Sequence, residues 1–430
     1  MSTDQTTARR QLYLEVPDFG INFTAGTYSG GYVTTQDPRV VMGGSLVQSE
    51  RYRGTYLNRP DRAAGDQVRP VGDISYGSLQ VTINHDGAAW TNTTDTNVEI
   101  VAMPPDDLRS QVLNGALKKL RNRFLVPLAH GPDDHDMQAS TDTEWDDTNA
   151  SFASQTTLTE VLSAKRSKAL TLSGAGGYTQ SADLYRMGRS RSGTLFARVK
   201  ADIGTGIARL VDASGNTIAS VSFSQEEWLL VKKPFSLSST QEQIRPRLLG
   251  TDISDQIDVQ DFWFVKDGAL TFELPSWLSE LATVRGIYRG HLMDAGDEAD
   301  TYIENTMEME ALIKGTHYRH VYRPGTAHPH TIIIDRRFAS YLQDPLFVDI
   351  EQPWSHPFGV SALFSAETDT TDCPLAQLMA QAKLQLYQYD PDRFADLAGT
   401  AAVEKAFWDY KLRAPTPKQD RGWSGAYRRW

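Results

Sequence analysis

The sequence predicts an α+β protein of several domains, in which a small β-domain and a mixed helical core flank an inserted all-β sandwich. A chain of 430 residues, 40% of them hydrophobic, is long enough for about three domains that each bury a core. Short alternating runs between Gly-rich turns fill residues 1–103 and 132–268. Clear helical periodicity is confined to residues 104–128 and to two segments near the C-terminus. We therefore expect the sandwich to interrupt a core built from the two flanking parts.

The N-terminal β-domain is predicted over residues 1–103. Glycine-rich turns such as Gly43-Gly44 separate its strands. Residues 1–16 are polar and then strand-like, so no helix is expected before the first strand. The best strands are short alternating runs: Tyr32–Thr34, Ser45–Val47, Leu79–Ile83 and Val98–Val101.

An amphipathic helix is predicted over residues 104–128, PPDDLRSQVLNGALKKLRNRFLVPL. Asp106 and Asp107 follow two prolines, which favours a helix start, and Pro127 favours its end. The apolar residues recur at helical spacing: Leu108, Val112, Leu113, Ala116, Leu117, Leu120 and Phe124. Basic residues fall mostly outside this stripe, where a solvated face explains them as well as a contact with another subunit: Arg109, Lys118, Lys119, Arg121 and Arg123.

A β-sandwich is predicted over residues 132–268, because strands recur there between turn residues and no helical pattern is convincing. The segment Asp212–Asn216 has the composition of a hairpin turn. The predicted strands are Ala169–Leu172, Thr194–Val199, Ala208–Val211, Thr217–Val221, Trp228–Val231, Gln243–Leu248 and Asp258–Phe264.

The C-terminal part, residues 270–414, mixes strands with helices. Helices are predicted over Pro374–Tyr389 and Ala401–Arg413, and we expect the helix of residues 104–128 to bury its apolar stripe against both. Residues 415–430 form an extended basic and aromatic tail, for which disorder and docking through Trp423, Tyr427 and Trp430 are equal alternatives. The predicted strands are Met307–Ile313, Thr331–Ile334 and Leu346–Ile350.

Composition and motifs argue against several classes of function. A net charge of -11 argues against a general nucleic-acid binder, and Cys373, the single cysteine, excludes an intrachain disulfide. The sequence contains no Gly-x-Ser-x-Gly, His-Glu-x-x-His, Walker or Cys-x-x-Cys motif. It also lacks an apolar run of signal-peptide or membrane-span length. We predict a non-enzymatic protein with no cofactor and no metal, in no contact with a membrane.

Three groups of polar residues are weaker candidates for chemistry. The first could bind Ca²⁺, although a solvated linker is the favoured interpretation: His130, Asp133, Asp134, His135 and Asp136. The second could contain a glycosidase pair, although acidic pairs are common: Asp142, Glu144, Asp146 and Asp147. For the third we favour surface or interface roles over a ligand set: His317, His320, His328, His330 and His356.

Residues 136–265 include KALTLSG, SGTLFARVKA, EEWLLVKKPFSL, EQIRPRLLG and IDVQDFWFV. This stretch resembles the carbohydrate-binding jelly rolls of the galactose-binding-like class that are often inserted in tailed-bacteriophage virion proteins. The resemblance implies a jelly-roll sandwich displayed outward. It carries over no ligand residue, because sugar sites vary in position among such modules.

The flanking parts are similar to head-to-tail adaptor proteins of the phage neck, in AGTYSGGYVTT, in the helix with its Asp107–Leu120 run, and in the TDTTDCP segment that opens the helix LAQLMAQAKLQLY. The resemblance implies a closed ring of this chain, a dodecamer, between the portal protein and the next tail or neck protein. Genomic DNA would pass through its channel without specific binding. Capsid or host glycan would meet the sandwich, and the protein would be made in the host cytoplasm and reside in the virion.

Two alternatives remain open at this point. One is a tail fibre, baseplate or head-decoration protein that binds host glycans through the sandwich. The other is a polysaccharide-degrading enzyme with an accessory carbohydrate-binding module.

Overall fold

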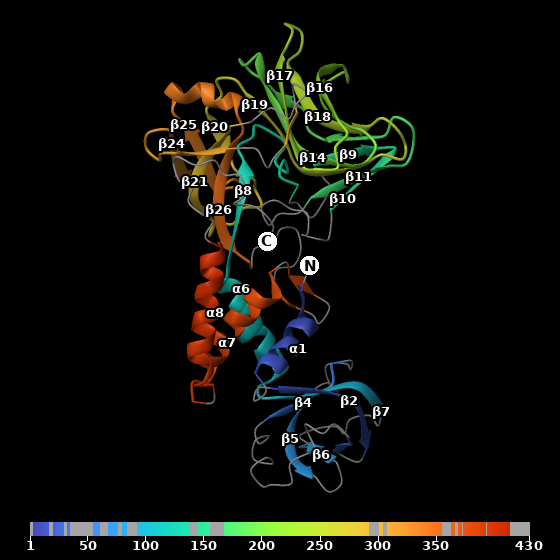
Figure 1. The fold of residues 1–430 in the computed structure, drawn as a ribbon, viewed down its shortest axis with the longest axis vertical. Coiled ribbons are helices and arrows are strands. Elements are labelled where there is room, and N and C mark those ends of the chain that lie inside the picture. The colour runs from blue at the N-terminus through green and yellow to red at the C-terminus, as the bar shows by residue number, and fades with distance from the viewer. Residues whose placement is uncertain are drawn as a thin grey trace. The chain divides into compact units, whose positions relative to one another are not determined.

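The structure is a computed structural model that describes residues 3–16, 20–29, 32–34, 55–60, 68–75, 80–83, 93–137, 144–154, 167–291, 301–303, 308–354, 363–365, 369–371, 373–392 and 394–412. The contacts of the chain divide it into two compact units. The barrel unit consists of Ser2–Leu120 and Ser361–Tyr410, and the sandwich unit is formed chiefly by Arg121–Val360 (Figure 1). Each is described by itself.

Six β-strands of the barrel unit close into an antiparallel barrel. The predicted strands Tyr32–Thr34, Leu79–Ile83 and Val98–Val101 are confirmed within it, whereas Ser45–Val47 lies outside the described residues. Around the barrel the order is β2 (Gly20–Ser29), β3 (Tyr32–Thr34), β6 (Gln80–Ile83), β5 (Val68–Ser75), β4 (Tyr56–Asn58) and β7 (Thr93–Val101).

A helix, α1 (Gln5–Glu15), precedes the barrel, so the expectation of no helix in residues 1–16 is wrong. Asp4 caps it, since its side chain accepts a hydrogen bond of 2.6 Å from the amide of Thr7. Ala8 and Leu12, one helical turn apart, are fully buried. The cap and this short apolar stripe define a helix that the polar composition of the segment concealed. Before it, β1 (Thr3–Asp4) pairs with β27 (Thr370–Thr371).

The helix predicted after the barrel is correct as far as residue 119 and wrong beyond it. It runs as α5 (Pro105–Asp107), the π-helical segment η1 (Leu108–Leu113) and α6 (Asn114–Lys119). Its apolar stripe is buried, and α7 (Leu375–Tyr389) packs against η1 and α6, as predicted. From residue 121 the chain is instead the strand β8 (Arg121–Pro127).

The predicted C-terminal helices are both present, as α7 and α8 (Leu397–Leu412). Lys383 of α7 joins three helices, because its Nζ lies 2.6 Å from Glu15 of α1 and 2.7 Å from Glu404 of α8. These two carboxylates raise the pKa of Lys383 against the effect of its burial. The side chains of α8 beyond Ala406, and the whole of the tail, lie outside the described part of the chain.

A buried polar network fixes α1 to the barrel. Glu99 of β7 is fully buried and pairs with Arg9 of α1 at 2.9 Å. Its Oε2 also accepts hydrogen bonds from Tyr13 Oη at 3.1 Å and from Asn58 Nδ2 at 2.8 Å. One carboxylate therefore holds a helix and two strands together, and its charge is compensated where water cannot reach it.

The sandwich unit contains the predicted β-sandwich, and all of its predicted strands and the Asp212–Asn216 hairpin are confirmed. One sheet has the order β10 (Ala150–Ser154), β11 (Lys168–Leu172), β19 (Gln256–Lys266), β14 (Ser192–Ile203), β17 (Leu229–Ser236) and β22 (Thr301–Ile303). The other has the order β16 (Thr217–Phe223), β15 (Gly206–Asp212), β18 (Gln243–Gly250), β12 (Tyr178–Ser181) and β9 (Trp145–Thr148), with β13 (Tyr185–Arg186) also on β18. A single hydrophobic core lies between them.

Two smaller sheets complete this unit. The first has the order β20 (Thr271–Glu273), β25 (His330–Ile334) and β24 (Tyr318–Tyr322). The second has the order β23 (Glu308–Leu312), β21 (Thr283–His291), β26 (Leu346–Pro353) and β8, and the 3₁₀ segment η4 (Arg336–Gln343) precedes β26. The predicted C-terminal strands are confirmed as β23, β25 and β26.

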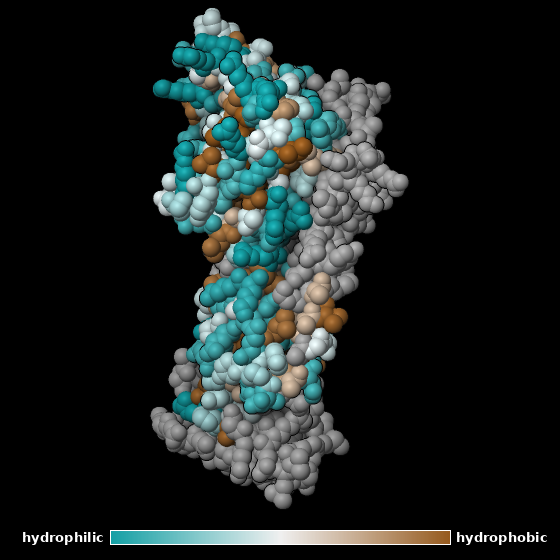
Figure 2. All heavy atoms as spheres, turned by 90° about the vertical axis from the view of Figure 1, so that its left-hand side faces the viewer, coloured by the Kyte–Doolittle hydropathy of each residue, from teal (hydrophilic) through white to brown (hydrophobic). Residues whose placement is uncertain are grey.

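The residues coloured in Figure 2 are mostly hydrophilic, with hydrophobic residues in small, separate patches. Large hydrophobic side chains that are more than half exposed include Leu14, Leu281 and Val403, and they come from distant parts of the chain. In the described residues, no helix is both long and apolar enough to cross a membrane.

We expect Glu99→Ala to destabilise the barrel unit by about 3–5 kcal/mol, because it leaves the guanidinium of Arg9 buried without its carboxylate. The midpoint of urea denaturation of the full chain measures this effect. Asp106→Ala is the control, since Asp106 pairs with Arg109 on the surface and its loss should change the midpoint little. Equal midpoints for the two variants would contradict the prediction.

Candidate functional site

The basic residues predicted on one helical face are divided between the two units. Arg109 forms a surface ion pair of 2.7 Å with Asp106, and Lys118 is exposed. Lys119 Nζ donates hydrogen bonds to Gln385 and Gln388 of α7, at 3.1 and 2.8 Å. Two of these three cations are therefore engaged within the barrel unit.

The other two basic residues of the predicted helical face, Arg121 and Arg123, lie on β8 of the sandwich unit. Arg121 is exposed. Arg123 forms a bidentate pair with the buried carboxylate of Asp349 on β26, with Nε 2.7 Å from Oδ1. The predicted aromatic contacts Trp423, Tyr427 and Trp430 fall outside the described residues.

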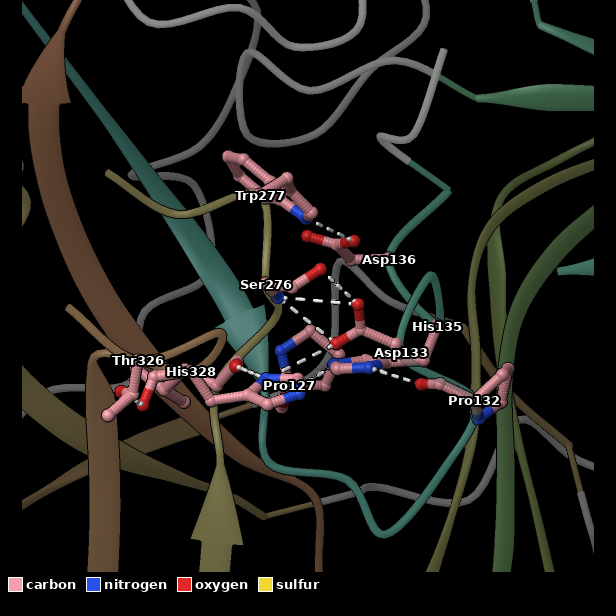
Figure 3. A network of polar contacts seen from close by, with 10 residues as sticks. Pro127, Pro132, Asp133, His135, Asp136, Ser276, Trp277, Thr326 and His328 are labelled. Carbon is pink, nitrogen blue, oxygen red and sulfur yellow. Dashed lines mark hydrogen bonds and ion pairs between the residues drawn. The ribbon is translucent and has the colours of Figure 1, made fainter. Parts of the chain in front are cut away.

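The acidic segment after β8 makes specific contacts within the sandwich unit (Figure 3). Asp133 accepts hydrogen bonds from the amide and the hydroxyl of Ser276, and lies 3.6 Å from Nδ1 of His328. Asp136 accepts a hydrogen bond of 3.1 Å from the indole nitrogen of Trp277. These contacts tie the segment to the loop between β20 and β21, so it is not a solvated linker.

Asp134 and His135, which lie between Asp133 and Asp136, also make contacts within the sandwich unit. Asp134 forms a buried ion pair of 2.8 Å with Lys168. The ring nitrogens of His135 lie 2.8 and 2.9 Å from the carbonyl oxygens of Pro132 and Pro127, and burial lowers the pKa of the ring. No three His, Cys, Asp or Glu side chains in the described part of the chain are placed to hold a metal ion.

His130, the first residue of the same segment, is held in its neutral form. Its Nδ1 accepts a hydrogen bond of 3.1 Å from the amide of Lys266, and its ring lies 4.3 Å from that of Phe272. Burial and the charge of Lys266 lower the pKa of His130 to about 3.

Three of the acidic residues considered as a glycosidase pair lie in or directly before β9. Asp146 and Asp147 are neighbours in β9 and point to opposite faces of the sheet. Asp147 accepts a hydrogen bond of 2.9 Å from the amide of Phe152. Burial and nearby aspartates raise the pKa of Glu144, while Asp142 lies outside the described residues.

The C-terminal histidines do not all take surface roles. His330 is buried, and its Nδ1 lies 3.1 Å from Nε2 of His320. His317 Nδ1 accepts a hydrogen bond from a backbone amide, and His328 Nδ1 donates to a backbone carbonyl at 2.9 Å. His356 lies outside the described residues. These contacts hold the β20–β25–β24 sheet and its loops.

The outer face of the sheet that contains β14 and β19 is covered, and we call it the covered sheet. Phe196 and Trp263 stack on this face at 5.1 Å, and Trp263 meets Phe347 of β26 edge-on at 6.1 Å. Arg198 and Asp261 form an ion pair of 2.9 Å there, and both are at most 2% exposed. A ligand therefore has no access to these side chains.

The other sheet leaves its outer face partly exposed, and we call it the open sheet. Its central strand β18 alternates strictly, with Ile244 and Leu248 in the core and Arg245 and Arg247 directed outward. The register places Arg209 of β15 directly opposite Arg247. Arginines of adjacent strands therefore share the outer face.

Arg247 is held in position by the neighbouring strand β12. Its guanidinium lies 4.2 Å from the ring centre of Tyr178. Its Nε and Nη2 both donate to Oε1 of Gln180, at 3.0 and 2.7 Å. Burial and the charges of Arg245 and Arg209 lower the pKa of Arg247.

Further polar residues extend this outer face. Asp146 of β9 is opposite Gln180, and Arg186 of β13 is opposite Gln243. The hairpin turn between β15 and β16 approaches the face, since a Cβ on Gly215 would lie 3.7 Å from Nη2 of Arg247. Gly215 has φ +86°, a conformation that favours glycine. The face thus combines an aromatic ring with planar hydrogen-bonding groups.

Only Asp146 of this face was among the residues singled out from the sequence. The signal for the others is the alternation in Gln243–Leu249, where arginines replace apolar residues at the outward positions. That pattern predicts a polar outer face, but it does not show that β12 and β15 bring Tyr178, Gln180 and Arg209 to the same place.

No family model and no curated protein matches the chain. Among solved structures, it is similar to the enzymatically active domain of bacteriophage CBA120 tailspike protein 4, with 13% identity and a TM-score of 0.26 over 32% of this chain and 21% of that one. It is also similar to the CBM22-1 xylan-binding domain of Paenibacillus barcinonensis Xyn10C, with 13% identity and a TM-score of 0.25 over 31% of this chain and 91% of that one.

A third similar structure is the carbohydrate-binding module CBM6cm-2 of Cellvibrio mixtus lichenase 5A, with 12% identity and a TM-score of 0.22 over 32% of this chain and 98% of that one. The chain spans about a fifth of the tailspike chain and nearly all of the two carbohydrate-binding modules. The comparisons give no support to the expected head-to-tail adaptor.

We expect His130 to make the sandwich unit sensitive to acid. The unfolded chain takes up a proton on this ring below its ordinary pKa of 6.5, whereas the folded protein does so only near pH 3. Stability is therefore lost as the pH falls from 6.5 towards 3, by about 2 kcal/mol at pH 5. Urea denaturation at pH 7 and pH 5 should show a smaller loss for His130→Asn than for the wild type. Parallel losses in the two proteins would contradict the assignment.

Proposed function

We propose that this chain is a non-enzymatic glycan-binding protein, and that the outer face of the open sheet holds the sugar. The observation that carries the proposal is the group formed by Tyr178, Gln180 and Arg247 on the outer face of the open sheet, where Tyr178 and Arg247 are half-buried and Gln180 is buried. A sugar presents C–H groups that pack on an aromatic ring and hydroxyls that bond to amide and guanidinium groups. A few positioned polar groups beside an aromatic side chain are typical of a small-molecule site.

The geometry of this group favours binding, because its side chains are already ordered. Stacking on Tyr178 and the two hydrogen bonds to Gln180 fix the guanidinium of Arg247. Ordering a long side chain on binding costs about 0.5–1.5 kcal/mol, and this cost is largely avoided here.

We place this activity in a tailed-phage virion, where the protein would attach to host glycans as part of a tail fibre, baseplate or head decoration. The resemblance of residues 136–265 to sandwiches inserted in virion proteins supports this setting. The barrel unit would then provide the contacts with copies of the chain or with other virion proteins. The protein would be made in the host cytoplasm.

A ring-forming adaptor between portal and tail is the less supported alternative. Arg109, Lys119 and Arg123, for which a contact with another subunit was one of two expectations, have partners within their own units. Among the residues coloured in Figure 2, apolar side chains gather only in small patches, whereas obligate interfaces are larger and more apolar.

Enzymatic cleavage of the glycan is the remaining alternative. Asp146 lies on the proposed binding face, but its neighbour Asp147 is directed to the other face and is bonded to a backbone amide. This arrangement supports binding without hydrolysis.

We expect the full-length chain to bind at least one polysaccharide in a panel of bacterial surface glycans, and Tyr178→Ala to weaken that binding about tenfold, equivalent to about 1.4 kcal/mol. Isothermal titration calorimetry measures both affinities. Tyr322→Ala is the matched control, because Tyr322 is 47% exposed on β24 of a different sheet. Equal weakening by both variants would count against the open face, and release of reducing sugars would count against a binding-only role.

A further inference from the structure

The outer face of the open sheet concentrates positive charge in an acidic chain. Arg209 and Arg247 are directly opposite on adjacent antiparallel strands, and Arg245 lies two residues from Arg247 on the same side of β18. Side chains in opposite positions have Cβ atoms about 4.5–5.5 Å apart, and like charges there are destabilising. Arg186 adds another cation at the end of the face.

Among the described residues, no carboxylate forms an ion pair with Arg209, Arg245 or Arg247. Arg247 is bound to a neutral amide and an aromatic ring. The Nε atoms of Arg209 and Arg245 are shielded from solvent and have no hydrogen-bond acceptor among the described residues. Asp146 is on the same face, but β12 lies between its strand and β18.

The chain therefore retains a repulsive arrangement that a ligand could relieve. Guanidinium groups match carboxylates in shape and bind them through paired hydrogen bonds. Neutral sugar hydroxyls would meet the same donors without relieving the repulsion between the arginines. The charge on this face thus favours a ligand that brings its own anions.

We propose that the open sheet is selective for acidic polysaccharides that carry carboxylates, with Arg209, Arg245 and Arg247 contacting the uronic acid groups and Tyr178 packing against a sugar ring. This inference rests on the proposed glycan binding and names its substrate class. A carboxylate of the ligand would occupy the space between the arginines of β15 and β18, beside the ring of Tyr178.

The test compares polymers that share one backbone. We expect the full-length protein to bind polygalacturonate at least about tenfold more tightly than its methyl ester, which keeps the sugar and loses the charge. Binding should weaken as salt is raised. Dextran and dextran sulfate form a second pair, and polyglutamate supplies carboxylates without sugar.

The outcomes separate the two proposals. Equal binding to polygalacturonate and its ester would overturn the charge selectivity while leaving glycan binding intact. Polyglutamate or dextran sulfate binding as tightly as polygalacturonate would also overturn it, in favour of a general polyanion surface. Failure to bind any glycan in either test would overturn both.

Single substitutions test whether Arg209 and Arg245 each contact the ligand. Arg209→Gln and Arg245→Gln should each weaken polygalacturonate binding about tenfold, and each should leave the urea midpoint unchanged or raise it, because a repulsive charge is removed. Arg323→Gln, an exposed arginine before the hairpin turn of β24 and β25, should change neither quantity. Weaker binding that is accompanied by a lower urea midpoint would instead indicate a structural role and would overturn the assignment.

Discussion

The contact between the covered sheet and the β23–β21–β26–β8 sheet is the constraint on which the rest of the sandwich unit depends. Trp263, Phe196 and Phe347 form its aromatic centre. The ion pair of Arg198 and Asp261 is buried in the same contact, where an unpartnered charge would be costly. Because this contact occupies one outer face of the sandwich, the candidate site lies on the other. The position of the candidate site thus follows from which face is buried.

Local patterns in the sequence predicted most of the secondary structure, because alternation and helical spacing are properties of short segments. The error after residue 119 shows the limit of prediction from such local patterns. Phe124 is one turn beyond Leu120 and fits the helical stripe, yet it lies in β8 opposite Ile350. The strand that pairs with this segment, β26, is more than 200 residues away in the sequence, so a short sequence window contains no information about the pairing. Pairing with β26 determined the structure of this segment, not its intrinsic preference.

The candidate site was less predictable than the fold for the same reason. Arg245 and Arg247 alternate with apolar residues in one strand, so the sequence indicates a polar outer face there. Tyr178, Gln180 and Arg209 lie on that face because of the register of β12 and β15 with β18, which the sequence does not show. Asp133 and Asp136 illustrate a related error. Their polar surroundings in the sequence favoured a solvated linker, whereas their partners, Ser276 and Trp277, lie about 140 residues later.

The partners of the buried cations distinguish structural charges from those available for binding. Arg9, Lys168 and Arg198 are each paired with a buried carboxylate, which neutralises them inside the fold. Arg247 is equally well ordered, but an amide and an aromatic ring hold it, and neither removes its charge. Unlike Arg9, Lys168 and Arg198, Arg247 is thus held in position without a carboxylate to compensate its charge. An external anion can then supply the missing charge at little cost in side-chain entropy, which is the condition for selective binding.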